Sequence, residues 1–202
     1  DPIEYHLEGI SQTRTRPDKG YDFANGLRAI VRQDPDVILV GEVRDLETAE
    51  ISLQAALTGH LVLTTLHTND AAGAVARLQS LGEKPYNIAP AVNVVIAQRL
   101  VRKVCPHCSI KEKISSEDYE KIERGLKNVS KEIIEFSKDS EVLKAVGCDK
   151  CNNTGYKGRV GIFEILKVDS EMEKLILSDP SSSEIREKAV DQGMLTIYQD
   201  GL

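Results

Sequence analysis

The four cysteines of this chain constrain its fold more than any other feature. They form two Cys-x-x-Cys pairs, Cys105–Cys108 and Cys148–Cys151, and 39 residues separate Cys108 from Cys148. Two thiolates at this spacing can bind one ion from a single turn, and four complete the tetrahedral shell that Zn²⁺ prefers. The sequence therefore predicts that part of the chain folds around a structural zinc ion with no open coordination position.

Disulfide bonding and thiol redox chemistry are the alternatives for these cysteines. Two Cys-x-x-Cys disulfides would be tight, and we find no secretory segment that indicates an oxidising compartment. A thioredoxin-like pair is expected to open a helix after a buried strand, which neither pair does. Gly147, Gly155 and Gly158 flank the second pair and supply the tight turns of a metal knuckle. We therefore favour zinc over both alternatives.

Length and composition are those of a soluble globular protein. The chain has 202 residues, of which 41% are hydrophobic, enough for one sizeable core or two small ones. Its strongly apolar runs, such as Val37–Val40, are far shorter than the roughly 20 residues that a transmembrane helix needs. It has no Trp, 4% aromatic residues and a net charge of -6. These values disfavour nucleic-acid binding and base stacking.

The charge is unevenly distributed along the chain. Residues 99–159 carry 14 basic and 10 acidic groups, whereas the segments on either side are acidic. This asymmetry indicates a positive face for an acidic partner or membrane surface, although a solvated Lys/Glu helix face is the more common reason.

Apolar periodicity predicts an alternation of helices and strands in the first half of the chain. A helix is expected over 21–33, ending before Pro35, and the apolar run Val37–Val40 reads as a buried strand. A helix over 46–58, with Asp45 as N-cap and Gly59 as stop, precedes a strand over 61–65, and Asn69 or Asp70 caps the next helix. This βαβα order predicts a parallel sheet covered by helices.

The second half gives weaker signals. Small helices are expected between the two cysteine pairs, over 115–146, where Lys and Glu are frequent. A β-rich run follows over 159–168, and two short amphipathic helices around Met172–Ile176 and Ile185–Val190 are expected to pack back on the sheet domain.

Polar residues follow both strands of the predicted parallel sheet. Glu42 comes just after Val40, and His67 comes just after the strand over 61–65. Ligands of such sheets bind outside the carboxyl ends of the strands. A carboxylate there can hold Mg²⁺ or polarise water, and an imidazole can contact a phosphate. Each residue alone is a weak signal, because Glu often caps helices and His often only satisfies a local polar group.

Three segments together resemble known motifs. These are Asp-Pro-Ile-Glu over 1–4, Asp-Pro-Asp-Val-Ile-Leu-Val-Gly-Glu-Val-Arg-Asp over 34–45 and Thr-Gly-His-Leu-Val-Leu-Thr-Thr-Leu-His-Thr-Asn-Asp over 58–70. They resemble the Asp box, Walker B motif and His box of the secretion ATPases, which power type II secretion and type IV pilus assembly. The resemblance continues through 97–102, the cysteines and Gly158–Glu164. The cysteines favour the assembly and secretion branch over the retraction branch, and no residue decides between pilus assembly and type II secretion.

The resemblance implies roles for individual residues. Glu4 corresponds to the Asp-box carboxylate that orients the attacking water, and Glu42 to the Walker B carboxylate near Mg²⁺. His60 and His67 correspond to the His-box pair, with His67 better placed to sense the γ-phosphate of ATP. His60 can instead have a purely structural role, since it follows Gly59 and its side chain can fix the turn before the strand.

The resemblance also implies the architecture. We expect an α/β fold in which 1–104 is the C-terminal portion of a RecA-like core with a mostly parallel sheet. Residues 105–158 then form the tetracysteine zinc module, and 159–202 a strand and helices packed on the core.

The phosphate-binding loop G-x-x-x-x-G-K-[ST] is absent from these residues. The chain therefore reads as a fragment that begins after this loop, and alone it is predicted to hydrolyse ATP negligibly.

The family further implies a cytoplasmic homohexamer that is peripheral to the inner membrane and acts on a membrane platform protein and an adaptor. Two other classes of protein remain as alternatives. A noncatalytic zinc-containing interaction module would account for the missing loop. A zinc-ribbon nucleic-acid-binding protein would account for the cysteines and the basic middle segment.

Overall fold

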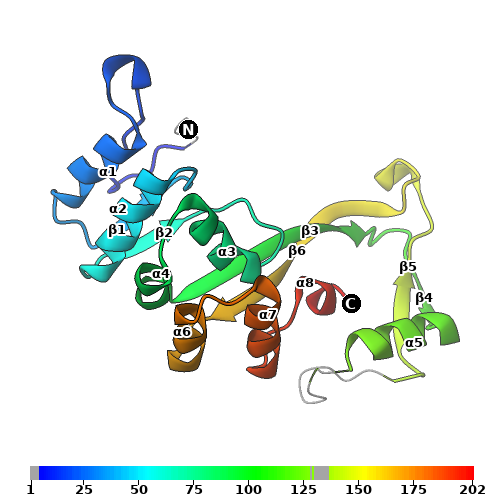
Figure 1. Cartoon of the computed structure of the whole chain (residues 1–202). Coiled ribbons are helices and arrows are strands. Elements are labelled where there is room, and N and C mark those ends of the chain that lie inside the picture. The colour runs from blue at the N-terminus through cyan, green and yellow to red at the C-terminus, as the bar shows by residue number, and fades with distance from the viewer. Residues whose placement is uncertain (1–4, 128, 130–136) are drawn as a thin grey trace. The chain divides into compact units, whose positions relative to one another are not determined.

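The computed structural model describes residues 5–127, 129 and 137–202. The described chain divides into two compact units, one comprising the residues through Val95 with Lys167–Arg186, the other Ile96–Leu166 with Glu187–Leu202. Helices and two-stranded sheets build the described part (Figure 1). The chain is therefore a mixed α/β protein. The motif-based division into 1–104, 105–158 and 159–202 stays a prediction.

The elements follow one another in an α/β order up to residue 104. A short 3-10 helix, η1, comes first. The bounds are η1 Pro17–Lys19, α1 Phe23–Val31, β1 Val37–Val40, α2 Leu46–Leu57, β2 Leu61–Thr64, α3 Ala72–Leu81, α4 Pro85–Ala91 and β3 Val94–Val104. The later elements are β4 Ile110–Lys113, α5 Ser116–Gly125, β5 Glu141–Lys144, the 3-10 helix η2 Asp149–Cys151, β6 Tyr156–Lys167, α6 Ser170–Leu177, α7 Ser182–Asp191 and α8 Ile197–Asp200.

The predicted βαβ unit is confirmed. Strands β1 and β2 pair in parallel, with Val37 opposite Leu61 and Val40 opposite Thr64. Helix α2 connects them and begins at the predicted cap, where the Asp45 side chain accepts a hydrogen bond of 2.8 Å from the backbone N–H of Thr48. The helix stops before Gly59, whose φ of 104° lies in the left-handed region that glycine tolerates.

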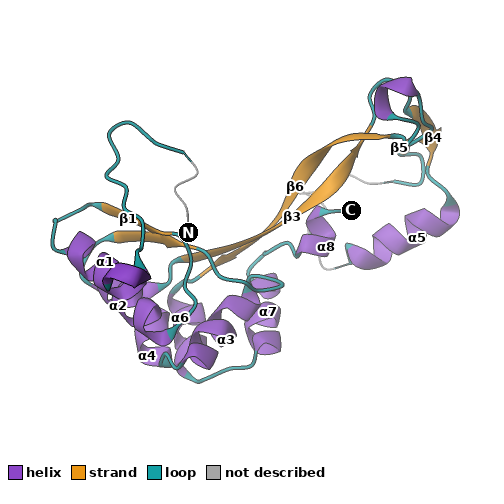
Figure 2. Cartoon of the chain, turned by 90° about the horizontal axis from the view of Figure 1, so that it is seen from above, coloured by secondary structure: helices purple, strands orange, loops and turns teal. Residues whose placement is uncertain are grey.

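One face of the β1–β2 sheet is covered by α1 and α2 (Figure 2). Its core comprises Leu27, Ile38, Val40 and Ala55, with Ile30, Val31, Ile51 and Val62 packed against them. The opposite face is open in this chain, because Val37, Leu39, Leu61 and Leu63 are 54%, 73%, 56% and 49% exposed. A continuous apolar run predicts burial on both faces of a parallel strand, so the structure provides only half of the expected cover.

Helix α4 lies at the centre of the first unit's helical layer. It packs against α2 and α6. Its Ile88 side chain is fully buried, as are Met172 and Ile176 of α6. The helix predicted around Met172–Ile176 thus exists, and its apolar stripe packs onto another helix of this unit.

The second unit contains two antiparallel pairs of strands. Strand β3 pairs with β6, and near one end the N–H of Cys105 donates a hydrogen bond of 2.9 Å to the carbonyl of Gly155. Strands β4 and β5 form a second pair, with Ile110 opposite Lys144. The prediction of helices alone over 115–146 is wrong for β5, although α5 is present. The two apolar residues of β5, Val142 and Leu143, are adjacent, so this short strand lacks the apolar alternation that signals one.

The C-terminal helix α8 is fastened to β6 by two carboxylates. The buried Glu164 side chain accepts a hydrogen bond of 3.1 Å from the N–H of Ile197, and Asp200 accepts one of 2.7 Å from the N–H of Phe163. The bond from Ile197 satisfies a donor of the first turn of α8, which has no partner within the helix.

Lysines of the β4–β5 pair lie beside acidic residues. Lys111 pairs with Glu141 at 3.4 Å, Lys113 with Asp139 at 3.2 Å and Lys144 with Glu112 at 2.9 Å. This arrangement favours a solvated face of mixed charge over a positive patch in this part of the segment. Within the described ranges, no helix combines the length and apolarity needed to cross a membrane.

Replacing Ile88 by Ala should lower the free energy of unfolding by about 2–5 kcal/mol, because a fully buried aliphatic side chain leaves a cavity. The matched control is Tyr86→Ala on the same helix, since Tyr86 is 66% exposed and should matter much less. Urea denaturation followed by circular dichroism measures both. Equal losses for the two variants would contradict the packing of α4 described above.

Candidate functional site

The parallel register of β1 and β2 brings the ends of the two strands together. Just beyond them, the N–H of Val43 donates to the carbonyl of Thr65 at 3.1 Å, and the Thr65 hydroxyl donates to the carbonyl of Gly41 at 2.7 Å. These bonds hold the segment after β1 beside the segment after β2. Glu42 and His67 therefore meet at the carboxyl edge of the sheet, where the sequence predicted them.

Glu42 is the centre of this cluster. One carboxylate oxygen lies 3.0 Å from Nε2 of His67, and the other accepts a hydrogen bond from the Arg44 guanidinium. The Glu42 side chain is 6% exposed, whereas the His67 side chain is 85% exposed. Arg44 is the main cause of a lowered pKa of Glu42, and His67 adds to it against the opposing effect of burial. The cluster thus keeps a carboxylate ionised next to an accessible imidazole.

The other predicted residues lie elsewhere. Nδ1 of the His60 ring donates to the carbonyl oxygen of Ala55 at 2.9 Å and lies 3.3 Å from the Thr58 hydroxyl. These contacts fix the turn after α2, which is the structural role weighed for His60. Glu4 lies outside the described residues.

Arg44 has no role in the sequence-based prediction, although it stands within the quoted motif. A signal for it exists, because side chains two apart in an extended segment point to the same side. Glu42 and Arg44 have this spacing after β1. A pattern rule that pairs a strand-end acid with a base two residues later would have found the contact.

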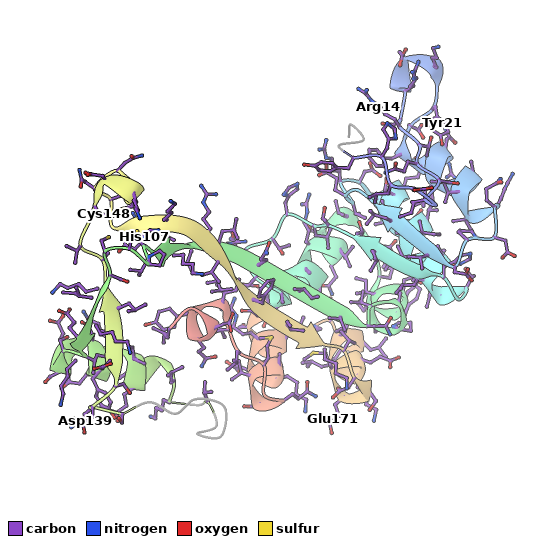
Figure 3. All side chains as sticks on the ribbon, turned by 180° about the vertical axis from the view of Figure 1, so that it is seen from behind. Arg14, Tyr21, His107, Asp139, Cys148 and Glu171 are labelled. Carbon is purple, nitrogen blue, oxygen red and sulfur yellow. The ribbon has the colours of Figure 1, made fainter. Side chains whose placement is uncertain are left out.

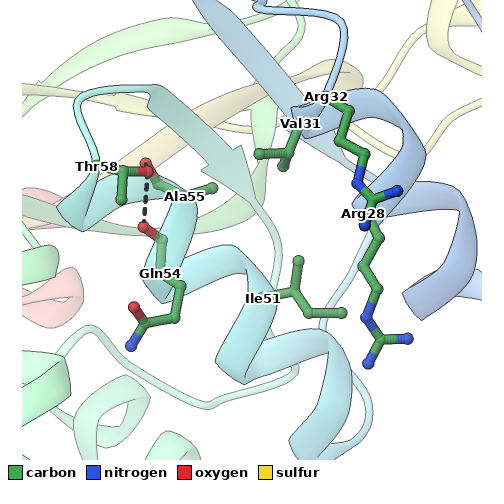
Figure 4. Close-up of a pocket in the computed structure, with 7 residues that line it drawn as sticks. All are labelled: Arg28, Val31, Arg32, Ile51, Gln54, Ala55 and Thr58. Carbon is green, nitrogen blue, oxygen red and sulfur yellow. Dashed lines mark hydrogen bonds between the residues drawn. The ribbon is translucent and has the colours of Figure 1, made fainter.

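Figure 4 shows a pocket on the outer side of α1 and α2. It is lined by Arg28, Val31, Arg32, Ile51, Gln54, Ala55 and Thr58. Arg28 forms an ion pair with Glu47 of α2 at 2.6 Å. None of Glu42, His60 and His67 lines this pocket, so it is separate from the strand-edge cluster.

The four cysteines converge as predicted. Their sulfur atoms lie within 4.8 Å of one another, and the cysteines are free thiols. Sγ of Cys151 is 3.8 Å from Sγ of both Cys108 and Cys148. This separation is far from the ~2.05 Å of a disulfide. It matches a tetrahedral zinc site, in which Zn–S bonds of about 2.3 Å place the sulfurs about 3.8 Å apart.

Tight turns shape the cysteine cluster. Figure 3 labels Cys148 and the neighbouring His107 at this end of the second unit. Gly147 has a φ of 115°, and a Cβ there would lie 2.9 Å from the carbonyl oxygen of Asn153, so only glycine fits. The N–H groups of Gly147 and Gly155 point at Sγ of Cys108 and Cys151, each at 3.3 Å. Such donors stabilise thiolates.

The thiols have unequal acidity. Burial raises the pKa of Cys108 to about 11. Although burial also acts to raise the pKa of Cys151, the N–H groups of Cys148 and Gly155 lower it to about 6. Four thiolates within 4.8 Å of one another would repel strongly, so a cation is needed to hold all four in the ionised form. The donor set therefore fits a metal ion of the zinc type.

Comparisons with known proteins agree over the whole chain. The family described as "Type II/IV secretion system protein" matches residues 1–202. The type IV pilus assembly ATPase PilB of Thermus thermophilus is 48% identical over the full chain, which covers 22% of that protein. The type II secretion system ATPase E of Vibrio cholerae is also 48% identical, and the chain covers 38% of it. The chain belongs to the type II/IV secretion system protein family.

Solved structures give a consistent result. The pilus retraction motor PilT with bound ADP superimposes with a TM-score of 0.57 and 26% identity, covering 99% of this chain and 49% of that one. The Legionella pneumophila ATPase DotB gives a TM-score of 0.56 and 26% identity, covering 89% and 37%. The chain thus spans about a fifth to a half of the length of these relatives.

Arg44→Gln should raise the pKa of Glu42 toward its ordinary value, because the guanidinium that lowers it is removed. A lowered folded-state pKa stabilises the fold above the unfolded-state pKa. The stability advantage of the wild type should therefore be complete at neutral pH and disappear as the pH falls through the folded-state pKa of Glu42. Carboxyl titration by NMR, combined with denaturation at several pH values, measures both effects.

The control for this experiment is Arg28→Gln, which removes an arginine–glutamate pair on the surface of α1 and α2. It should leave the titration of Glu42 unchanged. An identical Glu42 titration in the Arg44→Gln variant and the wild type would contradict the cluster described here.

Proposed function

We propose that this chain forms part of a RecA-like ATPase motor that powers type IV pilus assembly or type II protein secretion. The observation that carries the proposal is the pairing of Glu42 with His67 at the carboxyl edge of β1 and β2. Its support comes from relatives named as ATPases of both machines. Because relatives of both names are 48% identical, the choice between the two machines stays open.

In this proposal, the strand-edge cluster acts on ATP and Mg²⁺. When bound, Mg²⁺ neutralises charge on the phosphate oxygens. The Glu42 carboxylate is held ionised by Arg44 and is therefore suited to bind a metal-coordinated water or to polarise an attacking one. With a proton on both ring nitrogens, the exposed His67 side chain can donate one hydrogen bond to Glu42 through Nε2 and a second to a terminal phosphate through Nδ1. Glu4 keeps its proposed role in orienting water.

The remaining parts of a motor are proposed to lie in additional polypeptide. This sequence lacks the glycine-rich loop whose N–H groups and lysine hold phosphates. The exposed apolar face of β1–β2 supports the same idea, because parallel strands are ordinarily covered on both faces. The relatives are also much longer than this chain. The 202 residues alone are accordingly proposed to be inactive.

The tetracysteine cluster is proposed to hold one structural Zn²⁺ through Cys105, Cys108, Cys148 and Cys151. Sulfur–sulfur distances of 3.8 Å and N–H donors to the sulfurs support this assignment. Four thiolates fill the coordination shell, so the ion stabilises the lobe and takes no part in ATP chemistry.

A larger assembly follows from the same proposal. We expect a homohexamer on the cytoplasmic side of the inner membrane, in contact with a platform protein and an adaptor. The support is indirect, since the relatives are named as components of secretion and pilus machines. The alternatives of a noncatalytic module and a zinc-ribbon nucleic-acid binder gain no specific observation here.

Glu42→Gln in the longer protein that contains this chain should lower kcat for ATP hydrolysis by about 100-fold or more, because a neutral amide cannot act as a base or hold a cation. Binding of a fluorescent ATP analogue should persist. The control Glu47→Gln removes a surface acid of α2 and should leave kcat within about twofold, as expected of an exposed pair. Phosphate-release kinetics measure the rates, and full activity of Glu42→Gln would refute the assignment.

Purified protein should contain one equivalent of zinc per chain, and Cys108→Ser should lower that content well below one. Plasma mass spectrometry gives the metal content directly. His107→Ala is the matched control, since His107 stands exposed between the two cysteines of the first pair and should be dispensable. Retention of zinc by Cys108→Ser together with its loss in His107→Ala would overturn the four-thiolate assignment.

A further inference from the structure

Residues 65–71 connect β2 to α3, and the segment 67–70 within this loop is held at both ends. At the first end, Nε2 of His67 lies 3.0 Å from a carboxylate oxygen of Glu42. At the second end, the Asp70 carboxylate uses both of its oxygens. Oδ1 accepts a hydrogen bond of 2.8 Å from the N–H of Gly73, and Oδ2 accepts one from the Arg186 guanidinium.

The local geometry around Asp70 is tightly specified. The Thr68 hydroxyl donates to the carbonyl of Asp70 at 3.0 Å. A Cβ on Gly73 would lie 3.2 Å from Oδ1 of Asp70, so the absence of a side chain there lets the carboxylate approach the first turn of α3. The Asp70 side chain is 22% exposed and the Arg186 side chain 47%, so the ion pair is partly exposed. The loop thus has one well-defined anchor next to α3.

The partner of that anchor comes from far along the chain. Arg186 belongs to α7 and is 116 residues from Asp70 in sequence. A second link joins the same two regions, because Nε2 of Gln79, near the end of α3, donates to Oδ1 of Asp179 at 2.6 Å. The segment that follows α6 therefore contacts α3 at two places, of which only Arg186 lies at the end next to His67.

We infer that Arg186 is a positioning residue for His67. Its guanidinium holds Asp70, Asp70 fixes one end of the segment 67–70, and the fixed segment keeps the His67 imidazole beside Glu42. A guanidinium suits this task, because its planar donors hold a carboxylate in one orientation. Movement of α7 away from Asp70 would free the loop at its second anchor. The contact of Arg186 with Asp70 is thereby coupled to the geometry of the strand-edge cluster.

The anchoring is tested on the 202-residue chain by amide hydrogen exchange, which requires no activity. Arg186→Gln should speed exchange of the amides of residues 67–70 by about two- to fivefold, the size expected for loss of one partly exposed ion pair. Arg186→Lys should restore part of the protection. Asp70→Asn keeps an oxygen for the Gly73 N–H but loses the charge. It should have the same effect, and the double variant should add nothing further.

The matched control is Gln79→Ala, which breaks the other link between α3 and the C-terminal segment. It should speed exchange near the end of α3 and leave residues 67–70 unchanged. Unchanged loop exchange in Arg186→Gln, additive effects of the two single variants, or an equal loop effect of Gln79→Ala would each overturn the inference.

The consequence for turnover rests on the proposed function and is measured in the longer ATPase. Arg186→Gln should lower kcat by about the same factor by which it loosens the loop, with KM for ATP nearly unchanged. Faster loop exchange with unchanged kcat would overturn the positioning of His67 and leave the proposed function intact. A wild-type protein that does not hydrolyse ATP would refute the proposed function alone, since the exchange experiment still decides the anchoring.

Discussion

The parallel pairing of β1 with β2 is the constraint on which the rest of the site depends. The parallel register places Val40 opposite Thr64. Just beyond the strands, the hydrogen bond from the N–H of Val43 to the carbonyl of Thr65 continues the pairing. This geometry brings a buried carboxylate and an exposed imidazole to one edge. A shift by one residue would turn each side chain to the other face of the sheet and separate Glu42 from His67.

The two units are stabilised in different ways. In the first, helices α1, α2, α4 and α6 pack apolar side chains into a shared layer, and the strand-edge cluster is built on that layer. In the second, cysteine sulfurs and the glycine turns around them take the place of a large apolar core. The long strands β3 and β6 carry exposed apolar residues, including Ile96, Leu100 and Ile165. The metal ion proposed for the four cysteines would give a small lobe of this kind stability that burial alone does not supply.

The sequence predicted the elements whose signals are local and missed those that depend on distant contacts. Asp45 and Gly59 mark the ends of α2 because capping and left-handed backbone are short-range effects. The cysteine cluster was predictable because metal coordination requires a fixed spacing. Strand β5 was not predicted because it is only four residues long and its apolar residues, Val142 and Leu143, are adjacent rather than alternating. The Asp70–Arg186 contact was not predicted, because no local sequence pattern indicates which residue pairs with another 116 positions away.

The central claim is that Glu42 and His67 form one nucleotide site at the edge of β1 and β2. A structure of the longer protein with Mg²⁺ and a non-hydrolysable ATP analogue tests it most directly. The account predicts the terminal phosphate within hydrogen-bonding reach of the His67 imidazole, and the Glu42 carboxylate facing the same metal and water cluster. A nucleotide bound elsewhere, with both side chains turned away from its phosphates, would contradict it.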